Sequence, residues 1–271
     1  MVMPMLHAYL FGGLALDAGD PLPPIRSRAA RSLLAYLLTY RNRPHTRDLL
    51  AGTFWPDLTD AAARRRLTQE LWQIRTTLSP QPVLLAEGDT VQINPELPIW
   101  TDVTQFEQQA GPTATLQAAV DLYRGEFLAG YYDDWIIAER ERLHDLLLDA
   151  LDRLTEAYKT HGEHERALGC ARRLLAEDPW REEAHREVMR LCHLLGRSDE
   201  ALWQYNVCRK VLVEDLGAEP SPETTALAAE ISARSDLPQP PLLPARARPA
   251  SRSSRWRLHR WNGSSAEQAT Q

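Results

Sequence analysis

Apolar residues near the start of the chain follow two spacings, which predict strands first and helices afterwards. Residues 7–16 hold two short apolar stretches on either side of Gly12 and Gly13, a pattern that predicts a strand, a turn and a strand. Beyond a proline-rich loop, leucines recur at intervals of three and four residues, which is typical of helices that bury one face. Three helices are predicted, each opening at a side chain that can cap it: Ser27, Thr46 and Asp60.

The third helix, predicted over about 62–78, has two chemically distinct faces. One face is an apolar stripe whose members lie four, three and four positions apart: Leu67, Leu71, Ile74 and Leu78. At about 3.6 residues per turn, basic and polar side chains occupy the opposite face. They are Arg65, Gln69, Trp72 and Thr76, flanked by Thr68, Gln73 and Arg75. The pattern therefore predicts a helix that buries its apolar face and exposes its polar face to solvent.

A two-stranded hairpin is predicted after the third helix. Val83 and Leu85 alternate with their neighbours, as do Val91 and Ile93, and a Glu-Gly-Asp turn at 87–89 separates the two runs. Short strands, three helices and a hairpin in this order predict a winged helix-turn-helix over residues 5–96.

The exposed face of the third helix has the chemistry that reads DNA. The major groove admits one α-helix, in which Arg donates two bonds to guanine, Gln pairs with adenine and Thr contacts a thymine methyl group. Arg28 and Arg47 lie just inside the first and second helices, where they are placed for backbone phosphates. We predict DNA contacts from eight residues: Arg28, Arg47, Arg64, Arg65, Thr68, Gln69, Trp72 and Arg75.

Two other interpretations of this helix stay open at the level of sequence. The three arginines at 64–66 are also compatible with an ordinary solvated face, which is what charge runs usually form. Trp72 is compatible with a core or domain-interface residue and is an unusual choice for contact with bases.

The middle of the chain is a helical repeat. An offset of 34 aligns GEHERAL at 162–168 with GRSDEAL at 196–202, which is the spacing of tetratricopeptide repeats. Gly162 and Gly196 are expected to end the first helix of each pair in the left-handed conformation. Ala167 and Ala201 are small enough to let paired helices approach closely. The repeat is predicted over residues 100–232 as an all-α domain.

About three helix pairs are expected, because one pair cannot bury its own apolar face. Segments 115–123 and 135–150 are predicted to form an earlier, irregular pair. The dipeptide Asp178-Pro179 is predicted to stop a helix. A closing helix is predicted at 220–231, with Ser221 as its cap and Pro222 at its first position.

Length and composition agree with a mainly α, two-domain protein. The chain has 271 residues, of which 44% are hydrophobic and 25% charged, which excludes a wholly disordered chain. Its three cysteines have no CxxC spacing, and no apolar run approaches the ~20 residues of a membrane helix. These features predict a cytoplasmic protein without membrane contact. Residues 101–235 carry 26 acidic against 15 basic side chains, so this part is a poor candidate for nucleic acid.

No pattern in the chain supports catalysis or a cofactor. The motifs GxSxG, HExxH, GxGxxG and GxxxxGK[ST] do not occur. His161 and His164 with Cys170 could suggest a metal site, but they fall in a predicted interhelix turn and have no second ligand pair. Asp133 and Asp134 are better explained by helix capping than by acid–base chemistry. We therefore predict no catalytic residue, no metal ligand, no cofactor and no enzymatic activity.

Three runs of residues resemble a known family. Residues 26–57 (RSRAARSLLAYLLTYRNRPHTRDLLAGTFWPD) and 67–78 (LTQELWQIRTTL) look like the OmpR-type winged helix of Streptomyces antibiotic regulatory proteins (SARPs). Residues 122–143 (LYRGEFLAGYYDDWIIAERERL) look like the bacterial transcriptional activator domain (BTAD) that accompanies it. The resemblance covers about residues 5–232 and implies an activator that binds promoter repeats, often as a side-by-side dimer, and recruits RNA polymerase.

The resemblance also implies two functional elements. The segment at about 62–78 would be the recognition helix. The loop before it, with Trp55, Pro56 and Asp57, would face the sigma subunit of RNA polymerase.

The end of the chain, residues 234–271, is predicted to be a disordered basic tail. It holds five prolines, many Ser and Arg residues, and no hydrophobic periodicity. Arg side chains interleaved with Trp256 and Trp261 could make an accessory nucleic-acid contact, but a solvated end explains them as well. As a whole the sequence predicts a sequence-specific DNA-binding activator. The alternative is a tetratricopeptide adaptor that binds proteins and no DNA.

Overall fold

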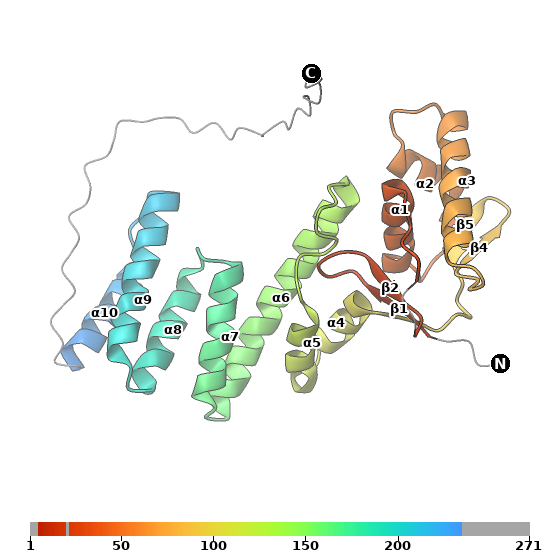
Figure 1. Cartoon of the computed structure of the whole chain (residues 1–271). Coiled ribbons are helices and arrows are strands. Elements are labelled where there is room, and N and C mark those ends of the chain that lie inside the picture. The colour runs from red at the N-terminus through yellow and green to blue at the C-terminus, as the bar shows by residue number, and fades with distance from the viewer. Residues whose placement is uncertain (1–4, 20–21, 235–271) are drawn as a thin grey trace, which may run out of the picture. The chain divides into compact units, whose positions relative to one another are not determined.

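The computed structural model describes residues 5–19 and 22–234, so the predicted basic tail lies outside it apart from Arg234. Helices make up most of the described chain, and its short strands all lie before residue 102. The mainly α fold class, with a small winged helix followed by a helical repeat, is confirmed (Figure 1).

Two capped helices and a longer one form the helical part of the winged helix. Ser27 accepts a hydrogen bond from the N–H of Ala30 at 3.2 Å, and Thr46 accepts one from Leu49 at 3.2 Å, so both predicted caps are confirmed. The prediction that Asp60 caps the third helix is wrong by one residue, because Thr59 is the N-cap and makes no side-chain bond. The elements in chain order are β1 (Leu6–Tyr9), β2 (Ala15–Asp17), α1 (Arg28–Thr39), β3 (His45–Thr46), α2 (Arg47–Phe54), α3 (Asp60–Thr77), β4 (Leu84–Glu87), β5 (Thr90–Ile93) and β6 (Ile99–Thr101).

The predicted apolar stripe of α3 lies in the core of the winged helix. Leu67, Ile74 and Leu78 are fully buried and Leu71 is 4% exposed. They pack in one cluster with the buried leucines of α1. Because this stripe fixes the rotation of α3 about its axis, the polar face of the helix points to solvent.

The wing is a three-stranded sheet rather than a two-stranded hairpin. The strand order is β3-β5-β4, with all neighbours antiparallel. The predicted phase of β4 is wrong: Leu84 pairs with Ile93 and is 6% exposed, whereas Leu85 is only partly buried. Consecutive leucines at 84 and 85 made the period-two pattern ambiguous, and the register with β5 decides it.

A second sheet, of order β2-β1-β6, lies at the start of the chain. The predicted hairpin of β1 and β2 is confirmed, and Gly12 and Gly13 have φ of 84° and 147°, which favours glycine. The sequence did not predict β6, which pairs in parallel with β1. A three-residue strand whose partner lies about ninety positions away leaves no periodic signal.

The repeat is built from helix pairs joined at glycines. Gly162 and Gly196 both have φ of 74°, and Ala167 and Ala201 are fully buried between helices, as predicted. The predicted stop at residues 178–179 and the closing helix with Ser221 as its cap are also confirmed. The helices are α4 (Asp102–Ala110), α5 (Leu116–Leu122), α6 (Asp134–Thr160), α7 (His164–Glu177), α8 (Glu182–Leu194), α9 (Ser198–Val211) and α10 (Pro222–Arg234).

The earliest helix pair differs from the prediction. Residues 135–150 are the first part of α6, which continues to Thr160 and pairs with α7 across Gly162. The earlier pair consists of α4 and α5. Asp133 occupies the expected N-cap position of α6, although its side chain makes no capping hydrogen bond. Gly162 marks the end of α6, but the sequence contains no signal that residues 135–150 continue as one helix to Thr160.

Aromatic rings join the winged helix to the repeat. Tyr36 of α1 packs edge-on against Trp135 of α6, with ring centroids 5.1 Å apart. The hydroxyl of Tyr40 donates to Glu139 at 3.3 Å, and burial, with Glu139 nearby, raises the pKa of Tyr40 to about 12. The phenol therefore stays protonated at neutral pH and keeps its role as donor.

Candidate nucleic-acid interface

The polar face of α3 is exposed along the length of the helix. Trp72 has 66% of its surface exposed, which excludes the interpretation of this residue as part of the core. The exposed members of the face are Arg65, Thr68, Gln69, Trp72, Arg75 and Thr76. Six side chains on one exposed helix face form the contiguous polar surface that contact with base edges requires.

The buried side of α3 removes a carboxylate from this surface. Glu70 is the one acidic residue of the sequence between 61 and 77, and it is 1% exposed. Its Oε1 lies 2.9 Å from Nε of Arg66, one helical turn earlier. Because this charge is buried and paired, it opposes a polyanion less than an exposed carboxylate would.

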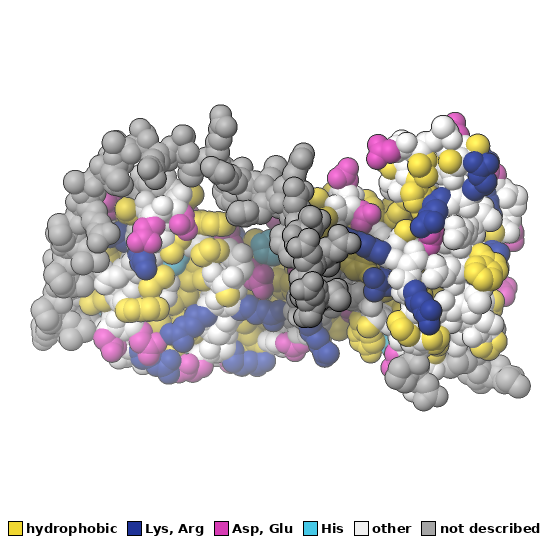
Figure 2. All heavy atoms as spheres, turned by 45° about the horizontal axis from the view of Figure 1, so that its top comes forward, with side chains coloured by type: hydrophobic (Ala, Val, Ile, Leu, Met, Phe, Trp, Pro, Cys, Tyr) yellow, Lys and Arg dark blue, Asp and Glu magenta, His cyan; other side chains and the backbone are white. Residues whose placement is uncertain are grey.

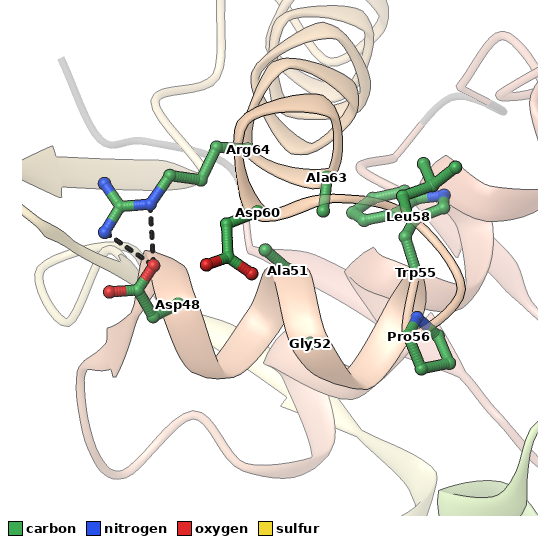
Figure 3. A pocket seen from close by; sticks show the side chains of 9 residues that line it. All are labelled: Asp48, Ala51, Gly52, Trp55, Pro56, Leu58, Asp60, Ala63 and Arg64. Atoms are coloured by element: carbon green, nitrogen blue, oxygen red, sulfur yellow. Dashed lines mark hydrogen bonds and ion pairs between the residues drawn. The ribbon is translucent and has the colours of Figure 1, made fainter.

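Arg64 differs from its neighbours because two carboxylates hold it. Its Nη2 and Nε lie 2.5 and 2.6 Å from Oδ1 of Asp48, in the first turn of α2 (Figure 3). Its Nη1 lies 3.4 Å from Oδ1 of Asp89, in the turn between β4 and β5. Hydrogen bonding from Arg64 lowers the pKa of the Asp48 carboxyl, which is therefore ionised at neutral pH.

The two predicted phosphate contacts lie in different environments. Arg47 is the first residue of α2, and its backbone N–H donates to the carbonyl of Asp89 at 2.8 Å, which ties the helix start to the wing. Arg28 instead contacts the segment before α6: its Nη2 donates to the carbonyl of Gly130 at 3.2 Å, and its guanidinium lies 5.4 Å from the ring centroid of Tyr131. The structure thus places Arg47 beside Arg64 and the wing, whereas Arg28 packs against the repeat.

The loop between α2 and α3 borders a cavity of about 330 Å³ (Figure 3). Trp55 is half-buried against the core of the winged helix, whereas Pro56 and Asp57 are exposed and Leu58 is 44% exposed. The cavity is lined by Asp48, Ala51, Gly52, Trp55, Pro56, Leu58, Asp60, Ala63 and Arg64. An anchored tryptophan followed by exposed apolar and acidic side chains is a surface suited to a protein partner.

Charge on the described surface is mixed rather than concentrated. Figure 2 shows basic side chains spaced apart over the face of the winged helix that it presents, with acidic ones among them. In the repeat, arginines are widely paired with carboxylates, as in Arg172 with Glu200 at 2.6 Å and Arg181 with Asp152 at 2.5 Å. DNA affinity would therefore depend on a few cations of the winged helix rather than on a broad positive field.

Sequence reasoning missed Asp48 and Asp89 as parts of this surface. Asp48 had a signal, since an acidic residue in the first turn of a helix is common and favourable. Asp89 was assigned only to a turn. Their contact with Arg64 depends on how α2, α3 and the wing meet, which the local pattern does not encode.

The described residues form neither a metal-binding cluster nor a membrane-spanning helix. Within 5–19 and 22–234, no group of three or more His, Cys, Asp or Glu side chains is arranged to hold a metal ion. His161, considered above as a ligand, has its Nδ1 2.6 Å from the carbonyl of Ala157 in its own helix. None of the helices described is long and apolar enough to span a bilayer.

Comparison with known proteins identifies a matching domain family and several similar regulators. A family model described as "Bacterial transcriptional activator domain" matches residues 102–232. The "Regulatory protein AfsR" of Streptomyces coelicolor is 27% identical over 205 residues, which cover 71% of this chain and 20% of AfsR. The "Transcriptional regulatory protein MoaR1" of Mycobacterium tuberculosis is 25% identical over 238 residues, which cover 80% of this chain and 76% of MoaR1.

A solved structure shows the same fold. The chain superposes on Mycobacterium tuberculosis EmbR, solved in complex with a low-affinity phosphopeptide, with a TM-score of 0.66 and 24% identity. The match covers 86% of this chain and 66% of that EmbR chain. The chain spans about a fifth of the length of AfsR and matches MoaR1 over most of its length. The domain match assigns residues 102–232 to the bacterial transcriptional activator domain, and over most of its length the chain is similar to regulatory proteins of the SARP type.

Proposed function

We propose that this regulator is a sequence-specific DNA-binding activator that docks α3 in the major groove and recruits RNA polymerase. One observation carries the proposal: the basic and polar face of α3 is exposed, with its apolar stripe buried beneath it. Arg65, Gln69 and Arg75 offer the donors and acceptors that distinguish base pairs, and Thr68 offers a methyl group. Arg47 at the start of α2 and the wing beside it supply backbone contacts.

If Arg65 makes the proposed bidentate base contact, replacing it with alanine is expected to weaken binding to the preferred DNA sequence by about tenfold, since such a contact contributes roughly 1–3 kcal/mol. The preferred sequence is first obtained by selecting bound fragments from random DNA, which also reports repeat spacing and self-association on DNA. Affinity is then measured by gel shift over a series of salt concentrations.

Arg190→Ala is the matched control, because Arg190 is an exposed arginine of α8 whose partner is Glu187 of the same helix. Unchanged affinity of the Arg65→Ala protein would remove Arg65 from the interface. Complete absence of salt-dependent DNA binding by the unmodified chain would favour a tetratricopeptide adaptor instead.

We further propose that the loop with Trp55, Pro56 and Asp57 contacts RNA polymerase, with the sigma subunit as the partner that the family resemblance implies. Leu58→Ser is expected to reduce activation of transcription by about tenfold, because burying a leucine side chain against a partner contributes roughly 1.5–3 kcal/mol. DNA affinity should change little, because Leu58 lies before α3 and outside its exposed face.

Activation is measured in a reconstituted transcription reaction, and DNA affinity by gel shift on the same template. Leu216→Ser is the control, since Leu216 follows α9 and is 58% exposed. Equal losses of activation in the two variants, or a parallel loss of DNA affinity in Leu58→Ser, would contradict a polymerase-contacting role for the loop.

A further inference from the structure

Three elements of the proposed DNA interface meet at Arg64. The residue belongs to the second turn of α3, Asp48 to the first turn of α2, and Asp89 to the turn of the wing. The side chains remain open to solvent, with 45% of Arg64, 64% of Asp48 and 54% of Asp89 exposed. The cluster therefore lies at the surface, where a duplex can reach it.

The neighbouring arginines are held differently. Arg66 pairs with the buried Glu70 and also donates from Nη1 to Oε1 of Gln69 at 3.3 Å. Within the described part of the chain, Arg65 enters no ion pair, so its guanidinium is available to a ligand. Arg64 alone of the three is bound by carboxylates that are themselves exposed, which makes its partner exchangeable.

A carboxylate on an arginine occupies the position that a phosphate would take. Both anions accept charge-assisted hydrogen bonds from the same guanidinium nitrogens, with similar lengths. Asp48 accepts one such bond from Nε of Arg64, and Nη2 of Arg64 lies 2.5 Å from the same carboxylate oxygen as an ion pair. While this contact persists, Arg64 adds no net positive charge to the DNA-facing surface, and its donors are occupied.

We propose that the carboxylate of Asp48 competes with DNA phosphate for Arg64. Asp48 binds Arg64 in the free protein and releases it when α3 docks on a duplex. The inference rests on the proposed DNA binding and specifies how that site is regulated. On DNA, Arg64 exchanges the carboxylate of Asp48 for a backbone phosphate, while Asp89 keeps the wing beside α3. Because the contact between Asp48 and Arg64 must first break, affinity is lower for every duplex. This loss reduces binding to non-specific sequence in particular, because base contacts do not compensate for it there.

Asp48→Asn tests the competition. The substitution is nearly isosteric and removes the charge that holds Arg64. Affinity for a duplex without the preferred sequence is expected to rise about threefold to tenfold, whereas the slope of log K against log salt should change little, because Arg64 contacts a phosphate on DNA in both proteins. The same substitution in an Arg64→Ala background is expected to change affinity by less than about twofold, because the released cation is absent.

The double-mutant comparison separates competition from a general charge effect. Glu96→Gln removes a negative charge from the same winged helix at an exposed side chain beyond β5 and should have little effect in either background. A similar gain from Asp48→Asn with and without Arg64 would overturn the inference, and so would no gain at all. Urea unfolding of each variant, expected to match its parent protein, shows that the changes in affinity do not reflect loss of fold.

These outcomes also distinguish the inference from the function on which it rests. If the unmodified chain binds DNA with a clear salt dependence and Asp48→Asn binds with the same affinity, the proposed competition is wrong and the proposed DNA binding is retained. If neither the unmodified chain nor any variant binds DNA, the proposed function and the proposed competition are both wrong.

Discussion

Replacing Asp102 with alanine is expected to lower the free energy of unfolding by about 3 kcal/mol, because it leaves buried backbone donors without partners. The Asp102 side chain lies at the start of α4 and is 4% exposed. Its two oxygens each lie 2.9 Å from the N–H of Leu10, and Oδ2 also accepts from Phe11 at 3.0 Å. These contacts tie the end of β1 to the first helix of the activator domain.

The local charge balance explains why no other side chain replaces this aspartate well. Burial raises the pKa of Asp102, while the N–H groups of Phe11, Leu10 and Val103 favour its ionised form and oppose that rise. Asparagine would keep one acceptor oxygen and present a second group that cannot accept, so Asp102→Asn should lose an intermediate amount of stability. Alanine removes both acceptors.

Urea unfolding followed by circular dichroism measures the loss. Asp121→Ala is the control, because Asp121 is an exposed aspartate of α5 whose partner is Gln117 of the same helix. It is expected to change stability by less than about 0.5 kcal/mol. Equal effects of the two substitutions would mean that the contacts of Asp102 with residues 10 and 11 contribute little.

The same aspartate shows where sequence reasoning ends. Its neighbours Thr101 and Val103 continue an unremarkable run, and nothing local indicates that residue 10 lies against it. The contact forms because β6 pairs in parallel with β1, which brings the two segments together. By contrast, the caps at Ser27 and Thr46, the leucine stripe of α3 and the glycines at 162 and 196 depend on residues close in sequence, and these were predicted correctly.

The proposed DNA interface likewise combines features that the sequence predicts with features that only the tertiary structure shows. Helical spacing placed Arg65, Gln69 and Trp72 on one face, and the structure leaves that face exposed. The spacing gave no information about Asp48 and Asp89, which belong to other elements and form ion pairs with Arg64. A face is a property of one helix and can be predicted from periodicity, whereas the partners of its side chains depend on tertiary packing.

Trp135→Ala is expected to destabilise the chain by about 3 kcal/mol, because it opens a cavity where the two hydrophobic clusters meet. Trp135 packs against the core of the winged helix and against that of the repeat. Its ring centroid lies 5.1 Å from that of Tyr36 and 6.1 Å from that of Phe127, which belong to the winged-helix cluster and the repeat cluster respectively. Tyr36 in turn contacts Phe54 at the end of α2, with centroids 5.7 Å apart.

Two further substitutions identify the source of this loss. Trp203→Ala makes the same change at a residue of α9 that is 65% exposed, and it should cost less than about 0.5 kcal/mol. The indole Nε1 of Trp135 is buried and has no hydrogen-bond partner among residues 5–19 and 22–234. Trp135→Phe keeps an aromatic ring and removes that unsatisfied donor, so it should retain most of the stability that alanine loses.

The position of Trp135 also predicts how the alanine variant unfolds. Loss of the shared ring weakens the contact between the winged helix and the repeat more than it weakens either core, so the two parts should unfold less cooperatively. Urea unfolding monitored by fluorescence and by far-ultraviolet circular dichroism should coincide for the unmodified chain and separate for Trp135→Ala. Coincident transitions with an unchanged midpoint would show that the junction does not depend on this ring. DNA binding through the exposed face of α3 should persist, because no residue of that face contacts Trp135 in the ring contacts described.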